Sequence, residues 1–411
     1  MPPPPPGPAF RHSNFRYYIL ARVLTTTASE MQAVAVAWQV YSLTHRPLDL
    51  GLVGLAQFLP GILLFLVAGQ AADRFARQRI LQACCAGFAL CSLLLLGLTW
   101  HGFSSILPVY GVLLANGTVR AFNGPASQAF LPLLVPEKDF PKAVAWNSSV
   151  FQAATIAGPV AGGLLYGWTA SPTLVYTCAA IEYLLALLVL AGIRVRRAPG
   201  QRPEASYQMA LEGLRYIRRN KLILGAISLD LFAVLLGGAV ALLPVYAREI
   251  LKIGASGLGI LRSAPGLGAV IMALVVARWP LRRHAGAIML WCVCGFGIFT
   301  VVFGLSRQPA LSLAALALIG ACDMVSVIVR HTLIQLSTPD EMRGRVSAVN
   351  MVFIGASNEV GQFESGITAQ WFGTVPAVVL GGLGTIAIVA IWAWRFPALR
   401  RVNALVRPAR V

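Results

Sequence analysis

The side chains with the most obvious chemistry in this sequence are charged residues inside long apolar stretches. A charge in hydrocarbon costs at least ~2.5 kcal/mol, so each such residue invites a functional explanation. Nine of them stand in the apolar stretches: Glu30, Arg120, Glu182, Asp230, Arg262, Asp323, Arg330, Glu359 and Glu364. If all were ionised, three of the six acids would have no arginine to pair with, so some must carry a proton or exchange it for a cation. A proton-driven carrier needs this chemistry at minimum.

The elements that hold these charges follow from an apolar composition. Hydrophobic residues make up 57% of the 411 positions and charged residues 12%, about half the share usual in soluble domains, so most of the surface must face lipid. About twelve apolar stretches reach the length of roughly 20 residues that a membrane-spanning helix needs. They cover residues 17–43, 48–72, 80–100, 106–131, 143–168, 173–193, 222–246, 257–279, 285–305, 310–336, 346–371 and 375–394. The sequence therefore predicts an all-α membrane protein with about twelve transmembrane helices.

The basic residues indicate how the chain is threaded through the membrane. With the N-terminus inside, 26 of the 33 Lys and Arg fall in cytoplasmic segments or, like Arg22 and Arg278, at the cytoplasmic edges of the stretches, 4 fall outside and 3 fall within spans. Because positive charge concentrates on the cytoplasmic side, we expect both termini there. This topology also explains the formal net charge of +18. The basic residues are not interleaved with aromatic ones, so nucleic acid is not expected as a partner.

The two halves of the chain are related by an internal repeat. A shift of 203 positions aligns Gly117 with Gly320, Asn147 with Asn350 and Trp168 with Trp371. Such parallel repeats predict two six-helix pseudo-symmetric bundles around a central cavity. The expected segments are a disordered Pro-rich tail (1–14), a first bundle (15–193), a cytoplasmic linker with an amphipathic helix (194–221), a second bundle (222–396) and a basic tail (397–411).

A polar stripe follows the fourth stretch. Asn116, Arg120, Asn123 and Ser127 recur at helical spacing and share one face, which we expect to line the cavity. Arg120 is a candidate for proton coupling, and the three uncharged residues are candidates for substrate contact. The alternative is an arginine that only pairs with a structural carboxylate.

A second proton-coupling candidate, Asp323, occupies the position that the repeat relates to Arg120. It shares a helix face with Ser326 and Arg330. Opposite charges at these two repeat-related positions, Arg120 and Asp323, are what a switch based on an ion pair would use. Asp230, about 12 Å into the seventh stretch by helical rise, is a cavity candidate better suited to gating than to binding.

Two further acids are candidates for proton coupling. Glu30 lies midway along the first stretch, where the alternative to a proton-binding or substrate-sensing role is a structural hydrogen bond. In the eleventh stretch Asn358 and Gln362 share a face that Glu359 borders, so all three are cavity candidates. Glu364 lies about 140° around the helix from Glu359 and cannot share that face.

A short polar connection joins the second and third stretches. Gly69, Asp73, Arg74 and Arg77 place an acid among arginines in a link that cannot lie in hydrocarbon. An aspartate at a helix end can accept bonds from a neighbouring helix N-terminus and act as a latch during gating. The alternative is a hairpin that only enforces topology. The pattern resembles the loop between helices two and three of the major facilitator superfamily, although three positions depart from it.

A glycine motif in the fifth stretch resembles antiporters and exporters of that superfamily. Gly158, Pro159, Gly162 and Gly163 match the element G-P-x-x-G-G. Glycines permit close helix contact and the proline loosens the helix, which would help alternating access. The alternative is a purely packing role.

Longer blocks, at residues 120–136 and 338–345, resemble the exporter branch that includes enterobactin exporters and macrolide and multidrug efflux proteins. The resemblance extends over residues 15–401. It implies a secondary active transporter of the bacterial inner membrane, acting as a monomer, that exports a siderophore or an amphipathic drug-like compound by proton antiport. The alternatives are uptake or facilitated diffusion of a metabolite and, from another class, a membrane-embedded enzyme or receptor.

Neither a metal nor an organic cofactor is expected. The seven cysteines lie inside apolar stretches, the five histidines are scattered, and the sequence has no G-x-x-x-x-G-K-[ST] loop and no H-E-x-x-H pair. We therefore expect no enzymatic activity, with the proton gradient as the energy source, a small molecule as the substrate and membrane lipids as the surroundings.

Overall fold

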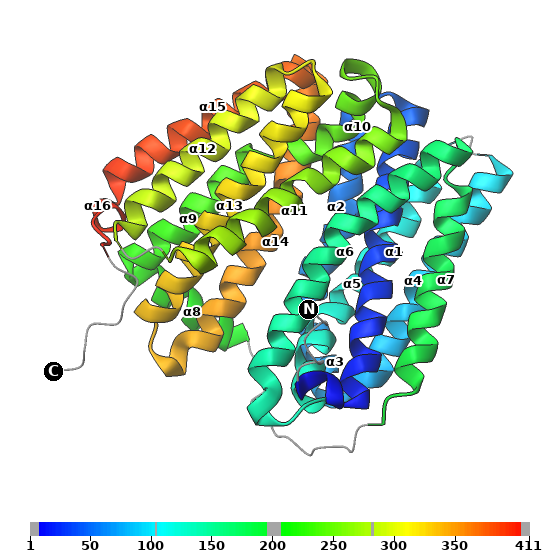
Figure 1. The fold of residues 1–411 in the computed structure, drawn as a ribbon, viewed down its shortest axis with the longest axis horizontal. Coiled ribbons are helices and arrows are strands. Elements are labelled where there is room, and N and C mark those ends of the chain that lie inside the picture. The colour runs from blue at the N-terminus through cyan, green and yellow to red at the C-terminus, as the bar shows by residue number, and fades with distance from the viewer. Residues whose placement is uncertain (1–7, 103–104, 195–206, 281–282, 404–411) are drawn as a thin grey trace, which may run out of the picture. The chain divides into compact units, whose positions relative to one another are not determined.

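The computed structural model describes residues 8–102, 105–194, 207–280 and 283–403, and every regular element among them is helical (Figure 1). Helices suit a lipid environment because each satisfies its own backbone polar groups. The all-α prediction is confirmed. Residues 1–7 of the expected Pro-rich tail, 195–206 of the linker and 404–411 of the basic C-terminal tail lie outside the described residues.

The chain divides into two compact units. Unit 1 comprises Met1–Thr44, Ala56–Ala205 and Gly254–Gly259, and unit 2 comprises His45–Leu55, Ser206–Ile253 and Ile260–Val411. The segment boundaries expected from the sequence stay a prediction.

Unit 1 is built mainly from the first seven α-helices. Its elements are η1 (Pro8–Arg11), α1 (Ser13–Thr44), the second half of α2 (Pro47–Leu63), α3 (Phe65–Arg74), α4 (Arg77–His101), α5 (Leu107–Phe130), η2 (Leu131–Leu133), η3 (Glu137–Asp139), α6 (Phe140–Thr169) and α7 (Thr173–Ala191). Helix α1 packs against α6 and α7, and α4 packs against α5 and α7 (Figure 1). Phe15, Phe130 and Leu190 are buried in the core of this unit. Phe88 on α4 stacks on Tyr183 of α7 with ring centroids 5.2 Å apart.

Unit 2 contains the remaining helices. Its elements are the first half of α2, α8 (Tyr207–Arg219), α9 (Lys221–Leu236), η4 (Ala239–Leu242), α10 (Leu243–Val245), η5 (Tyr246–Ile250), most of α11 (Gly254–Arg278), α12 (Ala285–Leu305), α13 (Pro309–Ser337), α14 (Asp340–Phe372), α15 (Thr374–Arg395) and α16 (Pro397–Arg400). Helix α12 packs against α13 and α15, and α9 packs against α14 and α15. Leu229, Val293 and Val329 are buried where α9, α12 and α13 meet.

Eight helical segments of the described residues are long and apolar enough to cross a membrane. Helices α1, α5 and α14 are 32, 24 and 33 residues long, which is enough to span, but they are more polar than those eight. They carry Glu30, Arg120 and Glu359 among their polar residues. These three more polar helices therefore carry many of the residues that we expect to bind protons or substrate.

Two expected spans are interrupted. In the second, α2 ends at Leu63 and α3 begins at Phe65, shortly after Pro60, which has no backbone N–H to donate. In the seventh, α9 ends at Leu236 and the chain continues through short 3₁₀, α and π segments. Gly237 and Gly238 mark this break, because glycine disfavours a helix interior.

The internal repeat is visible in equivalent glycine contacts. Gly117 on α5 lies so close to α2 that an added Cβ would collide with the Gln57 carbonyl oxygen. Gly320 on α13 lies against α11 in the same way, at the Pro265 carbonyl oxygen. The shift of 203 positions thus relates two residues with the same packing role in the two units.

We expect Gly117→Ala and Gly320→Ala to destabilise the protein by about 1–3 kcal/mol each, because the new methyl group overpacks a helix contact. Gly111→Ala, on the same helix as Gly117, is the matched control, since nothing lies within 4 Å of its Cβ position. Thermal unfolding of the purified protein in detergent measures the difference. Equal unfolding midpoints for the three variants would contradict the close contacts.

Candidate functional site

A buried ion pair joins two helices of unit 2. Arg330 on α13 pairs with Asp230 on α9, and their side chains are 2% and 9% exposed. Removing one partner of such a pair leaves an uncompensated charge in an apolar interior, at a cost of ~3–5 kcal/mol. The pair therefore fixes α9 against α13.

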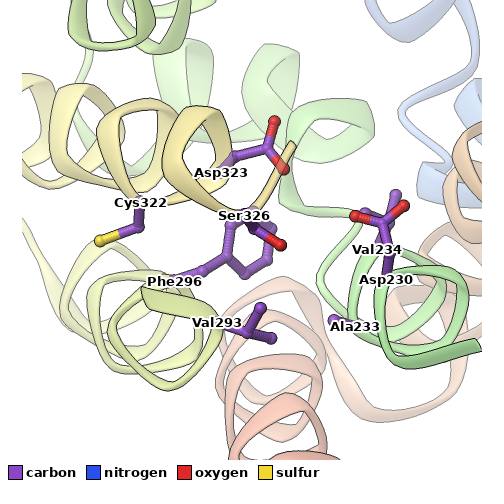
Figure 2. A pocket seen from close by; sticks show the side chains of 8 residues that line it. All are labelled: Asp230, Ala233, Val234, Val293, Phe296, Cys322, Asp323 and Ser326. Carbon is purple, nitrogen blue, oxygen red and sulfur yellow. The ribbon is translucent and has the colours of Figure 1, made fainter. Parts of the chain in front are cut away.

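A second carboxylate lies beside this pair. Asp323, two helical turns before Arg330, lines a cavity together with Asp230 and Ser326. Figure 2 shows the two carboxylates on opposite sides of this cavity, with the Ser326 side chain between them. Its volume is about 10 Å³, which is room for about one water-sized group.

The charges around this cavity do not balance. Two acids, Asp230 and Asp323, line the cavity, and the ion pair that the described residues show there, with Arg330, involves Asp230 alone, so the cluster is one positive charge short. Val293 and Phe296 of α12 form part of an apolar wall that cannot solvate the extra charge. A proton is the smallest species that restores balance here.

The structure brings part of the predicted α5 stripe together with α1. Ser127 is buried and shares a 2.7 Å hydrogen bond with the hydroxyl of Tyr18 on α1. Asn123 and Ser127 line a common cavity. Arg120 and Gly124 are exposed on α5, and Asn116 is half-buried.

The Glu30 region is a close contact between α1 and α6. A Cβ at Gly158 would lie 2.6 Å from the Glu30 Cβ, and one at Gly162 would lie 2.7 Å from the Met31 Cα. Glu30 itself takes part in a polar contact. The glycines of α6 therefore let its backbone approach the helix that carries this acid.

The same glycine motif has a second contact within unit 1, with residues 254–259 at the start of α11. A Cβ at Gly163 would lie 2.8 Å from the Gly259 Cα, and Gly259 faces the Pro159 carbonyl oxygen. The motif thus packs on two helices at once. A side chain at Gly158 or Gly162 would push α6 away from α1, and one at Gly163 would push it away from the start of α11.

On α14 the predicted polar residues bond mostly within their own helix. The Gln362 amide donates to Glu359 Oε2 at 3.1 Å, and the Asn358 amide donates to the Ile354 carbonyl at 2.8 Å. Thr368 donates to Glu364 at 2.7 Å. Glu359 and Gln362 therefore act as one polar group, and Glu364 makes a separate contact.

The predicted gating connection is a tight link between α3 and α4. Helix α3 ends at Arg74 and α4 begins at Arg77. The Arg77 Nε donates to the Ala72 carbonyl at 3.4 Å, so it caps the end of α3. Gly69 is half-buried within α3. The Asp73 side chain lies outside the described part of the structure, and the latch stays a prediction.

One cationic residue has a role that the sequence did not reveal. Arg22 was counted among the basic residues at the cytoplasmic edge, but it is the tenth residue of α1, and its Nε atom is buried with no hydrogen-bond partner among the described residues. Its position, four residues after Tyr18 on the same face, is the signal that could have identified it. The Asp230–Arg330 pairing was also not predicted, because sequence does not give the rotation of one helix relative to another.

Within the part of the chain that the structure describes, no three His, Cys, Asp or Glu side chains are grouped to hold a metal ion. All seven cysteines are free. Glu182 on α7 has a buried oxygen without a hydrogen-bond partner in the described residues, and it lines neither of the two cavities discussed above.

A helical membrane protein whose two units repeat the same helix contacts and hold charges in an apolar interior has the architecture of secondary transporters. The chain matches the model of the transmembrane secretion effector family over residues 6–408. It belongs to that family, which is a transporter family of the major facilitator superfamily and not a family of enzymes.

Among curated relatives, the enterobactin exporter EntS of Shigella boydii serotype 4 is 28% identical over 381 residues, which cover 91% of this chain and 86% of EntS. EntS of Escherichia coli O139:H28 is 27% identical over the same length.

Solved transporter structures share the fold. A bacterial homologue of the human lysosomal transporter Spinster matches with a TM-score of 0.70 at 13% identity, covering 94% of this chain and 96% of the homologue. A peptide transporter POT matches with a TM-score of 0.74 at 10% identity, covering 95% and 96%. Identities this low show the fold alone. The predicted all-helical, multi-span fold class and the superfamily are confirmed.

We expect Arg330→Met to destabilise the protein by about 3–5 kcal/mol, because it leaves Asp230 as a buried charge without its cation. The double variant Arg330→Met with Asp230→Leu should recover most of this loss, since an apolar pair of similar volume replaces the ion pair. Thermal unfolding of both variants in detergent measures the recovery. A double variant no more stable than the single one would show that the pair does not hold α9 against α13.

Proposed function

We propose that the protein is a proton-coupled exporter of a small molecule that works by alternating access. The observation that carries this proposal is the cluster of Asp230, Asp323 and Arg330, in which two acids line a water-sized cavity and the arginine pairs with one of them, Asp230. A proton that binds and leaves such a cluster changes its net charge. If the proton binds differently in two conformations, its gradient can drive the exchange between them.

In this proposal Asp323 is the main proton site, because Arg330 is already bonded to Asp230. Glu30 and Glu359 are further proton-binding candidates on the polar helices α1 and α14. Arg120 is the candidate counter-charge on α5. Asn116, Asn123 and Ser127 of unit 1 and Asn358 and Gln362 of unit 2 are the candidate substrate contacts.

The substrate class and the location rest on the relatives. The enterobactin exporters that this chain resembles favour export of a siderophore or an amphipathic drug-like compound. Their bacterial sources favour the inner membrane. We further propose a monomer with both termini in the cytoplasm, as the distribution of basic residues favours.

The decisive variant is Asp323→Asn, which removes the proton site and keeps the side chain's size. In everted vesicles with an imposed pH gradient, we expect it to reduce gradient-driven uptake of enterobactin, or of an amphipathic dye, at least about tenfold. Glu182→Gln, a carboxyl-to-amide change outside both cavities, is the matched control and should keep full transport.

Gradient-driven transport that survives in Asp323→Asn would refute this proton site. Glu30→Gln and Glu359→Gln then show whether either of the other acids carries the coupling. Transport by the unmodified protein that an uncoupler does not change would instead favour facilitated diffusion.

The proposed topology predicts opposite signals from two reporters. Green fluorescent protein fused after Val411 should fluoresce, because it folds in the cytoplasm, and alkaline phosphatase fused there should be inactive. Fusions to a chain truncated after Gly102, between the third and fourth expected spans, should give the reverse. Active phosphatase at the C-terminus would contradict the topology.

A further inference from the structure

A second cavity lies in unit 1 and is separate from the acidic cluster. Its volume is about 20 Å³, room for one or two water-sized groups. Its polar lining is Tyr18, Arg22 and Thr25 of α1 with Asn123 and Ser127 of α5, and its apolar lining comes partly from α4 and α7.

Arg22 is the charged group of this cavity, and no acid in the described residues pairs with it. Its Nε is buried without a hydrogen-bond partner, and its guanidinium lies 5.1 Å from the centroid of the Phe151 ring. Glu30, the next acid along α1, is two helical turns away, about 12 Å by helical rise. Arginine carries five N–H donors and no acceptor, so this side chain has donors to spare.

The other polar groups of the cavity cannot neutralise this charge. The hydroxyls of Tyr18 and Ser127 bond each other at 2.7 Å, and Thr25 donates to the Ala21 carbonyl at 2.9 Å. The amide of Asn123 lines the cavity as a further donor and acceptor. A ligand that enters this cavity can therefore bind the guanidinium of Arg22 and the amide of Asn123.

We propose that this cavity is the subsite for an anionic oxygen group of the transported molecule, a carboxylate or a phenolate. Such a group accepts hydrogen bonds without donating them, matches the guanidinium in charge and fits the small volume. The apolar walls suit the adjoining carbon frame. This assignment rests on the proposed transport function, whose substrate class it narrows to organic anions.

The test uses the full chain in nanodiscs of the zwitterionic lipid phosphatidylcholine, which exclude an anionic headgroup as the ligand. The probes are two matched pairs, benzoate with benzamide and salicylate with salicylamide. Binding is measured as the rise in the thermal unfolding midpoint with probe concentration, because a ligand that binds the folded state stabilises it. No gradient is needed, so a failure of proton coupling does not affect the result.

In the unmodified protein, at least one acid should raise the midpoint and its amide should not. Arg22→Gln should weaken this response by about tenfold or more, the loss typical of a charge-assisted contact, and Arg22→Lys should keep part of it. Arg16→Gln, on the same helix, is the matched control, because Arg16 is exposed and, within the described residues, bonds only Ser13. It should respond as the unmodified protein does.

Without probe, Arg22→Gln should be at least as stable as the unmodified protein, because holding a cation half-buried without a paired acid is unfavourable. The proposal is overturned if neither acid acts on the unmodified protein, if each amide acts as strongly as its acid, or if Arg22→Gln keeps the full response. A large loss of stability in Arg22→Gln and Arg22→Lys without probe would also overturn it, since it would show a structural arginine.

Discussion

Every buried charge in this protein needs an opposite charge, because lipid and apolar side chains cannot solvate it. Unit 2 meets this constraint incompletely. Arg330 pairs with Asp230, and Asp323 on the same cavity adds a second acid. In unit 1 the imbalance has the opposite sign, because Arg22 lines a cavity that has no acid in its described lining. Among the described residues, the unit 2 cavity thus lacks a positive charge and the unit 1 cavity lacks a negative one. Mobile ligands, a proton and an organic anion, are the groups that can supply both.

Close packing gives these charges their fixed positions. Glycines at helix contacts let backbones approach to distances that no side chain would allow, as Gly117 and Gly320 do in the two units. The apolar helices α4, α7, α12 and α13 supply much of the buried core. Helices α1, α5 and α14 are more polar and carry candidate residues on faces that include Glu30, Arg120 and Glu359. Such packing restricts how far a buried charge such as Asp230 can move toward water.

The sequence predicted what depends on local pattern and missed what depends on helix rotation. Apolar length gave the helices, and helical spacing placed Asp323 with Ser326 and Arg330 on one face, where the structure has the first two lining one cavity. The partner of Arg330 could not be predicted, because it lies on α9. Local sequence patterns do not determine how α9 is rotated about its axis relative to α13. The breaks after Leu63 and Leu236 were missed because apolar composition continues through them. Arg22 was missed because a basic residue near an expected membrane edge also satisfies the topology rule.

The signs of the two imbalances limit how proton and substrate can be coupled. An anion bound at Arg22 adds negative charge to the protein, and the sign of that charge favours a proton on Asp323, by an amount that falls with distance and with salt. Electrostatics alone would therefore make the two ligands bind together, which is the logic of symport. Exchange in opposite directions requires that each ligand prefer a different conformation strongly enough to outweigh this attraction. For an exporter of organic anions, the discrimination must then come from how the glycine-lined helix contacts and the Asp230–Arg330 pair change between conformations, and not from the charges themselves.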